Sequence, residues 1–169
     1  ENLLKLSLKY KINKFFFFSV LQVYGKEISG HVKSKNQIQL DNDYAKSHYL
    51  AEKIIERYSI VHKMNVNILR LAYSFSKPIN NQINRPDLIP INFCLDAINN
   101  KEIILESDGN ARRDFIYLND VFLKISKIMR LKLDKQIYYN FSSGKTFKIL
   151  EIARIVQRLG TKILSKKIQ

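Results

Sequence analysis

The chain has 169 residues, 46% of them hydrophobic and 26% charged, and its formal net charge is +14. This composition is ordinary for a globular protein, and the length is sufficient for a hydrophobic core. No apolar run reaches the roughly 18 residues of a membrane-spanning helix. The single cysteine, Cys94, excludes an internal disulfide framework and a cysteine-rich metal site. We therefore expect a cytoplasmic protein with no membrane partner.

The positive charge raises the question of nucleic-acid binding. Lysine and arginine are spread along the chain without an arginine-rich tract, and Lys, Ile and Asn are all abundant, as the codon usage of an AT-rich genome would produce. We therefore expect no nucleic-acid partner, although a basic nucleic-acid-binding domain stays open as an alternative that rests on charge alone. A positive field would also favour a small ligand that carries phosphate.

The first half of the chain alternates between helix and strand patterns. The end of a helix is predicted over 2–11, and the continuously apolar "KFFFFSVLQV" predicts a buried strand over 14–23. After a polar loop, a long helix is predicted over 43–62 and a second buried strand, "NVNILRLAYSF", over 65–75. The apolar face of the long helix is formed by Leu50, Ile54, Tyr58 and Val61. Strand, helix and strand in this order predict one parallel crossover unit.

The second half begins with a loop of turn-forming residues over 77–87. Helices are then predicted over 87–99, from Asn119 or Asp120 to about 131, and from a Thr146 cap to about Gly160, where a frayed basic end follows. Each helix has an apolar face: Leu88, Ile91, Leu95 and Ile98 share one face of the first, Val121, Ile125 and Ile128 are expected inward in the second, and Ile149, Ile152, Val156 and Leu159 line up in the third. Short strands are predicted at 102–105, 114–118 and 136–141. This alternation predicts an α/β fold.

Five stretches, in order, resemble the extended short-chain dehydrogenase/reductase family, and within it the NAD-dependent sugar-nucleotide epimerases and dehydratases. They are "KFFFFSVLQVYG", "YAKSHYLAE", "ILRLAYSFSKP", "SDGNARRDFIYLNDV" and "YNFSSGKTFKILEIARIV". The most specific pattern is DGxxxRDFxYxxDV, which is matched by Asp108, Gly109, Arg113, Asp114, Phe115, Tyr117, Asp120 and Val121. The resemblance spans essentially the whole chain.

The resemblance implies the C-terminal part of a Rossmann-like parallel sheet plus a smaller mixed α/β segment. Residues 1–76 would be the remnant of the nucleotide-binding domain with the active-site helix, and residues 77–169 the substrate-binding segment with closing strands and helices. It also implies NAD as cofactor, a nucleoside-diphosphate sugar as substrate, and a homodimer through the helix near the start and the 43–62 helix.

One part of the family pattern is missing from the sequence. Family members hold the cofactor pyrophosphate with a Gly-rich turn at a helix N-terminus. The chain has 5 glycines, and no two lie close enough to form that turn. We therefore expect the C-terminal part of a longer enzyme, or a product of gene truncation, that binds NAD poorly by itself.

By the resemblance, Tyr44 is the base that removes the proton from a sugar hydroxyl. The family places a lysine four residues later, which favours the tyrosinate and holds the nicotinamide ribose, and here this position is His48. A histidine can still bond a ribose hydroxyl, but it is mostly neutral at pH 7. Tyr49 and Lys53 also have the Tyr-x-x-x-Lys spacing, but they are out of register with Ser47 and Glu52, so we interpret Tyr49 as a surface or packing residue.

The third catalytic position of the family, a serine or threonine, falls on Val20, which has no donor. Ser19 is adjacent but faces the opposite side of a strand, and only a one-residue bulge would bring it into place. The pattern therefore leaves two hypotheses: an enzyme with altered catalytic residues, or a non-catalytic relative that binds a nucleotide sugar or a protein partner.

Other positions match the family pattern less closely. The backbone at Leu71 and Ala72 matches the stretch that flanks the nicotinamide, and Tyr73 replaces an asparagine that commonly touches the sugar nucleotide. Arg113 is a candidate for the substrate diphosphate, because a guanidinium suits phosphate. Its alternative is an ion pair with Asp114 or Asp120. Cys94 is expected in the core rather than as a nucleophile.

Overall fold

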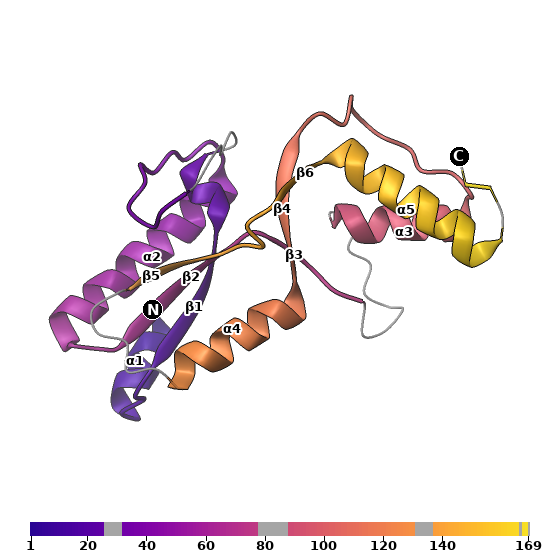
Figure 1. Ribbon diagram of the computed structural model, residues 1–169. Coiled ribbons are helices and arrows are strands. Elements are labelled where there is room, and N and C mark those ends of the chain that lie inside the picture. The colour runs from indigo at the N-terminus through magenta and orange to yellow at the C-terminus, as the bar shows by residue number, and fades with distance from the viewer. Residues whose placement is uncertain (26–31, 78–87, 131–136, 166, 169) are drawn as a thin grey trace. The chain divides into compact units, whose positions relative to one another are not determined.

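The computed structural model describes residues 1–25, 32–77, 88–130, 137–165 and 167–168 (Figure 1). The predicted loop residues 26–31 and 78–87 lie outside them. The chain divides into two compact units, each built from two separate stretches: unit 1 from Glu1–Ala72 and Lys127–Phe141, and unit 2 from Tyr73–Ser126 and Ser142–Gln169. Both units combine helices with strands, so the predicted α/β class is confirmed.

Unit 1 contains a parallel three-stranded sheet in the order β1-β2-β5. Its strands are β1 (Phe15–Val20), β2 (Val66–Leu71) and β5 (Tyr138–Phe141). Between β1 and β2 the chain passes through the short 3-10 helix η1 (Leu21–Tyr24) and the long helix α2 (Asp43–His62). Because β1 and β2 pair in parallel with α2 between them in the chain, the predicted crossover unit is confirmed.

The core of unit 1 lies on the sheet face where helix α1 (Asn2–Lys9) and α2 contribute side chains. Its buried members are Leu4, Ile55, Met64, Val66 and Ile68. Helix α2 begins where predicted because the Asn42 side chain accepts a hydrogen bond from the Ala45 amide at 2.8 Å, which satisfies a free N–H of the first turn.

The apolar face predicted for α2 is only partly buried. Leu50 and Val61 are both 63% exposed, whereas the buried residues of the helix are Ala45, Glu52 and Ile55. Of the predicted apolar face, Tyr58 packs against the core of unit 1, whereas Leu50, Ile54 and Val61 are exposed. The buried side of the helix carries a charged residue, Glu52. The side chain of Glu52 therefore requires a partner inside the protein.

Unit 2 contains a second sheet in the order β3-β4-β6. Its strands are β3 (Tyr73–Phe75), β4 (Arg112–Tyr117) and β6 (Thr146–Lys148), with β3 parallel and β6 antiparallel to β4. Helices α3 (Ile89–Asn99) and α5 (Ile149–Leu164) pack against each other, and α4 (Leu118–Arg130) follows β4 directly. The apolar run over 65–75, predicted as one strand, is thus two strands that belong to different sheets.

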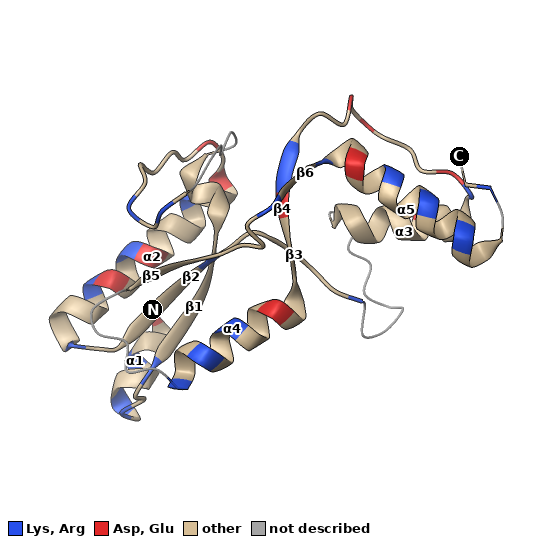
Figure 2. Cartoon of the chain, in the orientation of Figure 1, with Lys and Arg blue, Asp and Glu red and all other residues tan. Residues whose placement is uncertain are grey.

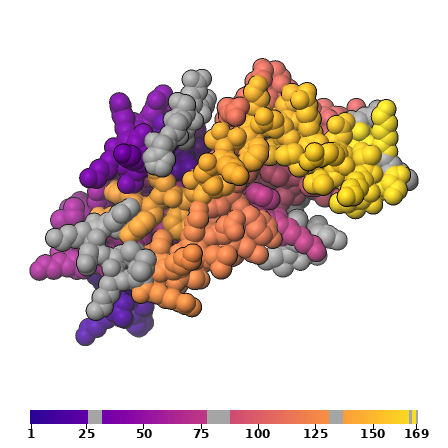
Figure 3. Space-filling view, viewed as in Figure 1, coloured from indigo at the N-terminus to yellow at the C-terminus, as the bar shows by residue number. Residues whose placement is uncertain are grey.

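Three further local predictions are wrong. Residues 102–105 form no strand, and no β-partner is assigned to them. Thr146 does not cap the last helix, because it pairs with Asp114 in the β4–β6 ladder; α5 begins at Ile149, and the Glu151 side chain accepts the Lys148 amide at 2.7 Å. Gly160 lies inside α5 rather than in a frayed end. The residues of α5 lie in the yellow part of the surface in Figure 3.

The DGxxxRDFxYxxDV motif has a structural role in unit 2. Gly109 has a φ of +68°, and a Cβ there would lie 2.9 Å from the Leu150 Cβ, so only glycine fits this approach to α5. The Asp114 carboxylate accepts the amides of Ser143 and Gly144 at 2.8 and 3.0 Å, which fixes the turn between β5 and β6. The core beside the motif is formed by Phe93, Phe115, Ile149 and Ala153.

Lysine and arginine lie on α1, α2, α4 and α5 rather than on one element (Figure 2). Within the part of the chain that the structure describes, no helix combines the length and the apolarity needed to span a membrane.

Candidate functional site

Tyr44 and His48 lie one turn apart at the start of α2. Their rings meet edge to face with centroids 4.7 Å apart, and the His48 ring is 6.1 Å from that of Phe17 on β1. Tyr44 is 54% exposed, so its phenol is accessible to a ligand. The structure therefore brings the two predicted catalytic residues into contact.

His48 combines a buried acceptor position with a low basicity. Its Nδ1 atom is buried and has no hydrogen-bond partner among the described residues. Burial lowers the pKa of the imidazole below 6.5, and the opposing effect of the Glu52 charge is smaller. A neutral imidazole can bond a hydroxyl group, but it supplies no fixed positive charge next to Tyr44.

Val20, the strand position at which the resemblance predicts a catalytic hydroxyl, carries none. β1 pairs with β2 in continuous register, with Ser19 opposite Arg70 and Val20 opposite Leu71, so the strand contains no bulge. Ser19 is 1% exposed, and its Oγ donates to Glu52 Oε1 at 2.5 Å. Val20 belongs to the apolar cluster of Val23 and Tyr24. The Ser19 hydroxyl is thus committed to Glu52, on the face opposite to Val20.

A buried ion pair that sequence reasoning missed lies behind His48. Arg70 donates from Nε and Nη2 to the two carboxylate oxygens of Glu52, at 2.9 and 2.6 Å, and both side chains are at most 3% exposed. Burial acts to lower the pKa of the Arg70 guanidinium, but the hydrogen bonds and charge of Glu52 outweigh it and raise the pKa above its ordinary value. The guanidinium also lies over the rings of Tyr24 and Tyr138, at 4.8 and 4.5 Å from their centroids. The pair joins α2 to β2 in a bidentate geometry.

Burial of the Tyr138 side chain also changes the pKa of its phenol. Burial, together with the nearby Glu56 carboxylate, raises the pKa of Tyr138 to about 12, against the opposing charge of Lys53. Tyr138 therefore stays protonated near pH 7 and acts as a packing surface for Arg70 rather than as a base.

Leu71 and Ala72, the predicted nicotinamide-flanking backbone, lie at the carboxyl end of β2. Leu71 pairs with Val20 on one side and Phe141 on the other, and the Ala72 amide donates to the Phe141 carbonyl at 2.8 Å. Ligands of open parallel sheets bind beyond the carboxyl ends of the strands. The position of this segment is consistent with a cofactor-flanking role.

Tyr73 and Arg113, the predicted substrate-binding residues, lie together in unit 2. The Arg113 guanidinium is 5.5 Å from the Tyr73 ring centroid, and the Tyr73 ring packs against Phe115 at 5.9 Å. Arg113 Nη1 donates to the Arg112 carbonyl at 2.8 Å. The alternative ion pair of Arg113 with Asp114 or Asp120 is not present among the described residues. Its charge is therefore not neutralised by these two carboxylates.

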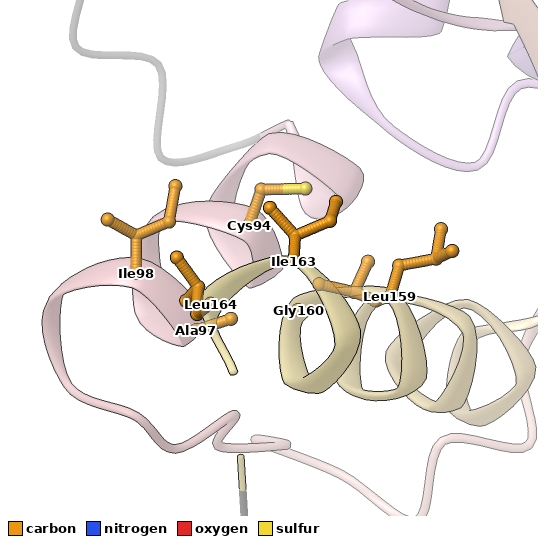
Figure 4. Close-up of a pocket in the computed structure, with 8 residues that line it drawn as sticks. Cys94, Ala97, Ile98, Leu159, Gly160, Ile163 and Leu164 are labelled. Carbon is orange, nitrogen blue, oxygen red and sulfur yellow. The ribbon is translucent and has the colours of Figure 1, made fainter. Parts of the chain in front are cut away.

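The surroundings of Tyr49 and Cys94 indicate structural roles rather than catalytic ones. Tyr49 packs in the apolar cluster of η1 and carries the Lys53 ammonium 5.3 Å from its ring centroid, as expected of a packing residue. Cys94 is exposed, so its predicted place in the core is wrong. It lines an apolar cavity of about 230 Å³ between α3 and α5, next to Ala97, Ile163 and Leu164 (Figure 4). Partial burial raises the pKa of its thiol, which disfavours a nucleophilic thiolate.

In the described ranges, no group of three or more His, Cys, Asp or Glu side chains could hold a metal ion. Tyr44 and His48 on α2, with the Glu52–Arg70 pair beside them, stay the candidate site of unit 1.

Several known proteins of similar sequence are named as sugar-nucleotide epimerases or dehydratases. A protein named "Putative UDP-glucose 4-epimerase" from Methanocaldococcus jannaschii is 28% identical over 158 residues, which cover 92% of this chain and 50% of that protein. The dTDP-L-rhamnose 4-epimerase of Burkholderia thailandensis is 28% identical over 113 residues, covering 67% of this chain and 31% of the relative. The chain thus spans at most about half the length of these curated relatives.

Solved structures show the same fold. An NAD-dependent NDP-hexosamine 5,6-dehydratase involved in tunicamycin biosynthesis matches with a TM-score of 0.82 at 24% identity, over 98% of this chain and 52% of its own. The UDP-glucose 4-epimerase of Thermotoga maritima, solved with UDP-glucose, matches with a TM-score of 0.81 at 19% identity, over 94% of this chain and 50% of its own. These matches confirm the Rossmann-like fold.

The family itself is shown by sequence. The model of the NAD dependent epimerase/dehydratase family matches residues 1–140, which contain α2, all of unit 1 except its last residue, and the motif around Arg113. The chain therefore belongs to the NAD dependent epimerase/dehydratase family, within the extended short-chain dehydrogenases/reductases.

Proposed function

We propose that the chain is the C-terminal part of an NAD-dependent epimerase or dehydratase that acts on a nucleoside-diphosphate sugar. The observation that carries this proposal is the contact of Tyr44 with His48 on α2, a helix anchored to the sheet by the Glu52–Arg70 pair. The sugar nucleotides named for the relatives support the substrate class. A cytoplasmic site of action agrees with the single cysteine.

Each residue has one task in this proposal. Bound NAD supplies a hydride acceptor for the carbon that carries the reacting hydroxyl. Tyr44, as the tyrosinate, accepts the proton of that hydroxyl, His48 bonds the nicotinamide ribose, and the Leu71–Ala72 backbone flanks the nicotinamide. Arg113 and Tyr73 bind the nucleotide sugar, the guanidinium at the diphosphate. Residues outside these 169 would hold the cofactor pyrophosphate, because no Gly-rich turn lies within them.

The experiment that tests the proposal restores the two altered positions in the full-length protein. The Val20→Thr, His48→Lys variant is expected to reduce NAD with a nucleotide sugar at least tenfold faster than the parent, because it gains a hydroxyl donor and a cation beside Tyr44. Stopped-flow absorbance of NADH and calorimetry of NAD binding are the measurements.

A matched control introduces the same two side chains at positions away from the site. Val61→Thr and His62→Lys place the same groups on the far end of α2, where Val61 is 63% exposed, and are expected to leave the rate unchanged. Absence of NAD binding by the full-length parent, or equal rates in the two double variants, would contradict the proposal.

The second candidate is a non-catalytic relative that binds a nucleotide sugar or a protein partner. Two observations favour it: the third catalytic position is an apolar valine in a closed cluster, and His48 is not cationic near neutral pH. It predicts nucleotide-sugar binding by calorimetry with no turnover in the parent. Rapid turnover before any substitution would rule this candidate out.

We also propose a homodimer through α1 and α2. Both helices expose apolar side chains that would otherwise face water, including Leu3 and Leu50 at 69% and 63% exposure. Leu50→Glu is expected to convert a dimer into a monomer in sedimentation velocity, whereas Leu123→Glu on α4, also 63% exposed, leaves it intact. A parent that sediments as a monomer at micromolar concentration would disprove this interface.

A further inference from the structure

Three neighbouring strands of unit 1 carry polar side chains at the same level of the sheet. Ser19 on β1 lies opposite Arg70 on β2, which lies opposite Asn140 on β5. Ser19 and Arg70 both bond Glu52 of α2, so this row faces α2. The hydrogen bonds of the Asn140 side chain among the described residues go to other partners, Tyr24 and Val32. Ser19 and Arg70 thus hold helix α2 through Glu52, whereas Asn140 acts on a different part of the chain.

The side-chain amide of Asn140 bridges two parts of the chain that precede α2. Its Oδ1 accepts a hydrogen bond from the Tyr24 hydroxyl at 2.9 Å, and its Nδ2 donates to the Val32 carbonyl at 2.9 Å. Tyr24 ends η1, and Val32 belongs to the segment that leads to α2. We propose that Tyr24 and Asn140 form a clamp that fixes the Val32–Asn42 segment against the sheet and thereby positions Tyr44.

Arg70 also bonds Tyr24 and thereby supports the clamp. Its Nη1 donates to the Tyr24 hydroxyl at 2.6 Å, and reaches the Ser34 carbonyl at 3.4 Å. The Tyr24 hydroxyl therefore accepts from Arg70 and donates to Asn140, which uses its donor and acceptor capacity together. Because Glu52 orients the same guanidinium, the hydrogen bonds that hold α2 and those that hold the preceding segment share one residue.

The rest of the segment is also held, up to the start of the helix. The Gln39 amide donates to the Val23 carbonyl at 2.9 Å. Gly25 has a φ of +102°, and a Cβ there would lie 3.2 Å from both the Gln39 and Asp41 side chains. Asn42 then caps α2 two residues before Tyr44. Release of the segment at Val32 would therefore loosen the chain that enters the catalytic helix.

The chemistry of an amide explains why asparagine suits the position. Asparagine offers a donor and an acceptor on one rigid group, whereas aspartate of the same shape offers only acceptors. Asn140→Asp would keep the bond from Tyr24 but would place a carboxylate oxygen against the Val32 carbonyl. Tyr24→Phe removes the bonds to both Asn140 and Arg70 and leaves the Asn140–Val32 bond.

The test is amide hydrogen exchange by NMR in the full-length protein. Asn140→Asp is expected to speed exchange of the Gln39 and Asn36 amides about three- to tenfold, as the loss of one hydrogen bond would, and to leave the sheet amides of Ile68 and Ala72 unchanged. The matched control is Tyr139→Phe, which removes from the same strand a buried hydroxyl that has no hydrogen-bond partner among the described residues. It is expected to leave all four amides unchanged.

Exchange at Gln39 that is equal in Asn140→Asp and Tyr139→Phe would overturn the clamp. Faster exchange at Ile68 and Ala72 to the same degree as at Gln39 would also overturn it, because the residue would then act on global stability alone.

The claim that the clamp positions Tyr44 rests on the proposed function, and a separate measurement, of kcat and KM, tests it. In the active full-length enzyme, Asn140→Asp is expected to lower kcat about tenfold with little change in the KM for the nucleotide sugar, because Tyr44 is misplaced rather than the substrate released. A loosened segment with an unchanged kcat would refute the positioning of Tyr44. If the parent has no turnover, the proposed function fails, while the exchange measurement still decides the clamp.

Discussion

An Arg70→Met variant is expected to lose about 3–5 kcal/mol of unfolding free energy, because it leaves the Glu52 carboxylate buried without its cation. Glu52 is 0% and Arg70 2% exposed, so water cannot replace the lost partner. Among the described residues, the Ser19 hydroxyl would be the remaining hydrogen-bond donor to that carboxylate. Urea denaturation followed by circular dichroism at pH 7 measures the loss.

Two companion variants identify the cause. Glu52→Leu together with Arg70→Met removes both charges and is expected to recover most of the loss, since an apolar pair of similar volume carries no buried charge. Lys53→Met removes a surface ion pair with Glu56, in which the lysine is 47% exposed, and is expected to cost less than about 1 kcal/mol. An Arg70→Met variant no less stable than Lys53→Met would show that the buried pair does not stabilise the fold.

Under the proposed function, a Tyr44→Phe variant of the full-length protein is expected to lose about 10²- to 10⁴-fold in the rate of NAD reduction by a nucleotide sugar, as removal of a general base does. The phenol ring and its contact with His48 stay, so binding of NAD and of the sugar nucleotide, measured by calorimetry, should change little. The lost group is a single hydroxyl on an exposed part of α2.

Tyr49→Phe is the matched control on the same helix. Tyr49 has the competing Tyr-x-x-x-Lys spacing but packs in the apolar cluster of η1, so its hydroxyl is expected to be dispensable for the reaction. Loss of activity in Tyr49→Phe with retention in Tyr44→Phe would reverse the assignment of the base.

The elements of the fold that were predictable are those with local signals. The boundaries of α2 follow from the Asn42 cap and a long helical pattern, and β1 and β2 from continuous apolar runs. The break at Ala72 has no local signal, because Leu71 and Tyr73 are both apolar and only the pairing of their strands with β5 and β4 separates them. Residues 102–105 are as apolar as a strand but have no neighbour to pair with. Pairing is a tertiary property that a local pattern does not contain.

For the site, the resemblance identified Tyr44 and His48, and the structure brings them into contact. The Glu52–Arg70 pair was missed because a glutamate on a helix is normally a surface residue. A signal was nevertheless present: Arg70 stands inside the apolar run "NILRLA", and a charge in a buried strand requires a partner. The bonds of Tyr24 and Asn140 join residues more than a hundred positions apart, so no local pattern could reveal them.

Unit 1 is assembled from two separate stretches of the chain, and this has a consequence during synthesis of the protein. Its last strand, β5, belongs to the Lys127–Phe141 stretch, which follows Ala72 only after 54 residues of unit 2. At about 5–20 residues per second, the ribosome takes several seconds to proceed from Ala72 to Phe141. Throughout that time Arg70 lacks Tyr138, the Tyr24 hydroxyl lacks Asn140, and the Phe-rich β1–β2 pair has an open edge. The nascent chain is therefore most exposed to aggregation in this interval, and a chaperone that binds apolar strands would act on it there.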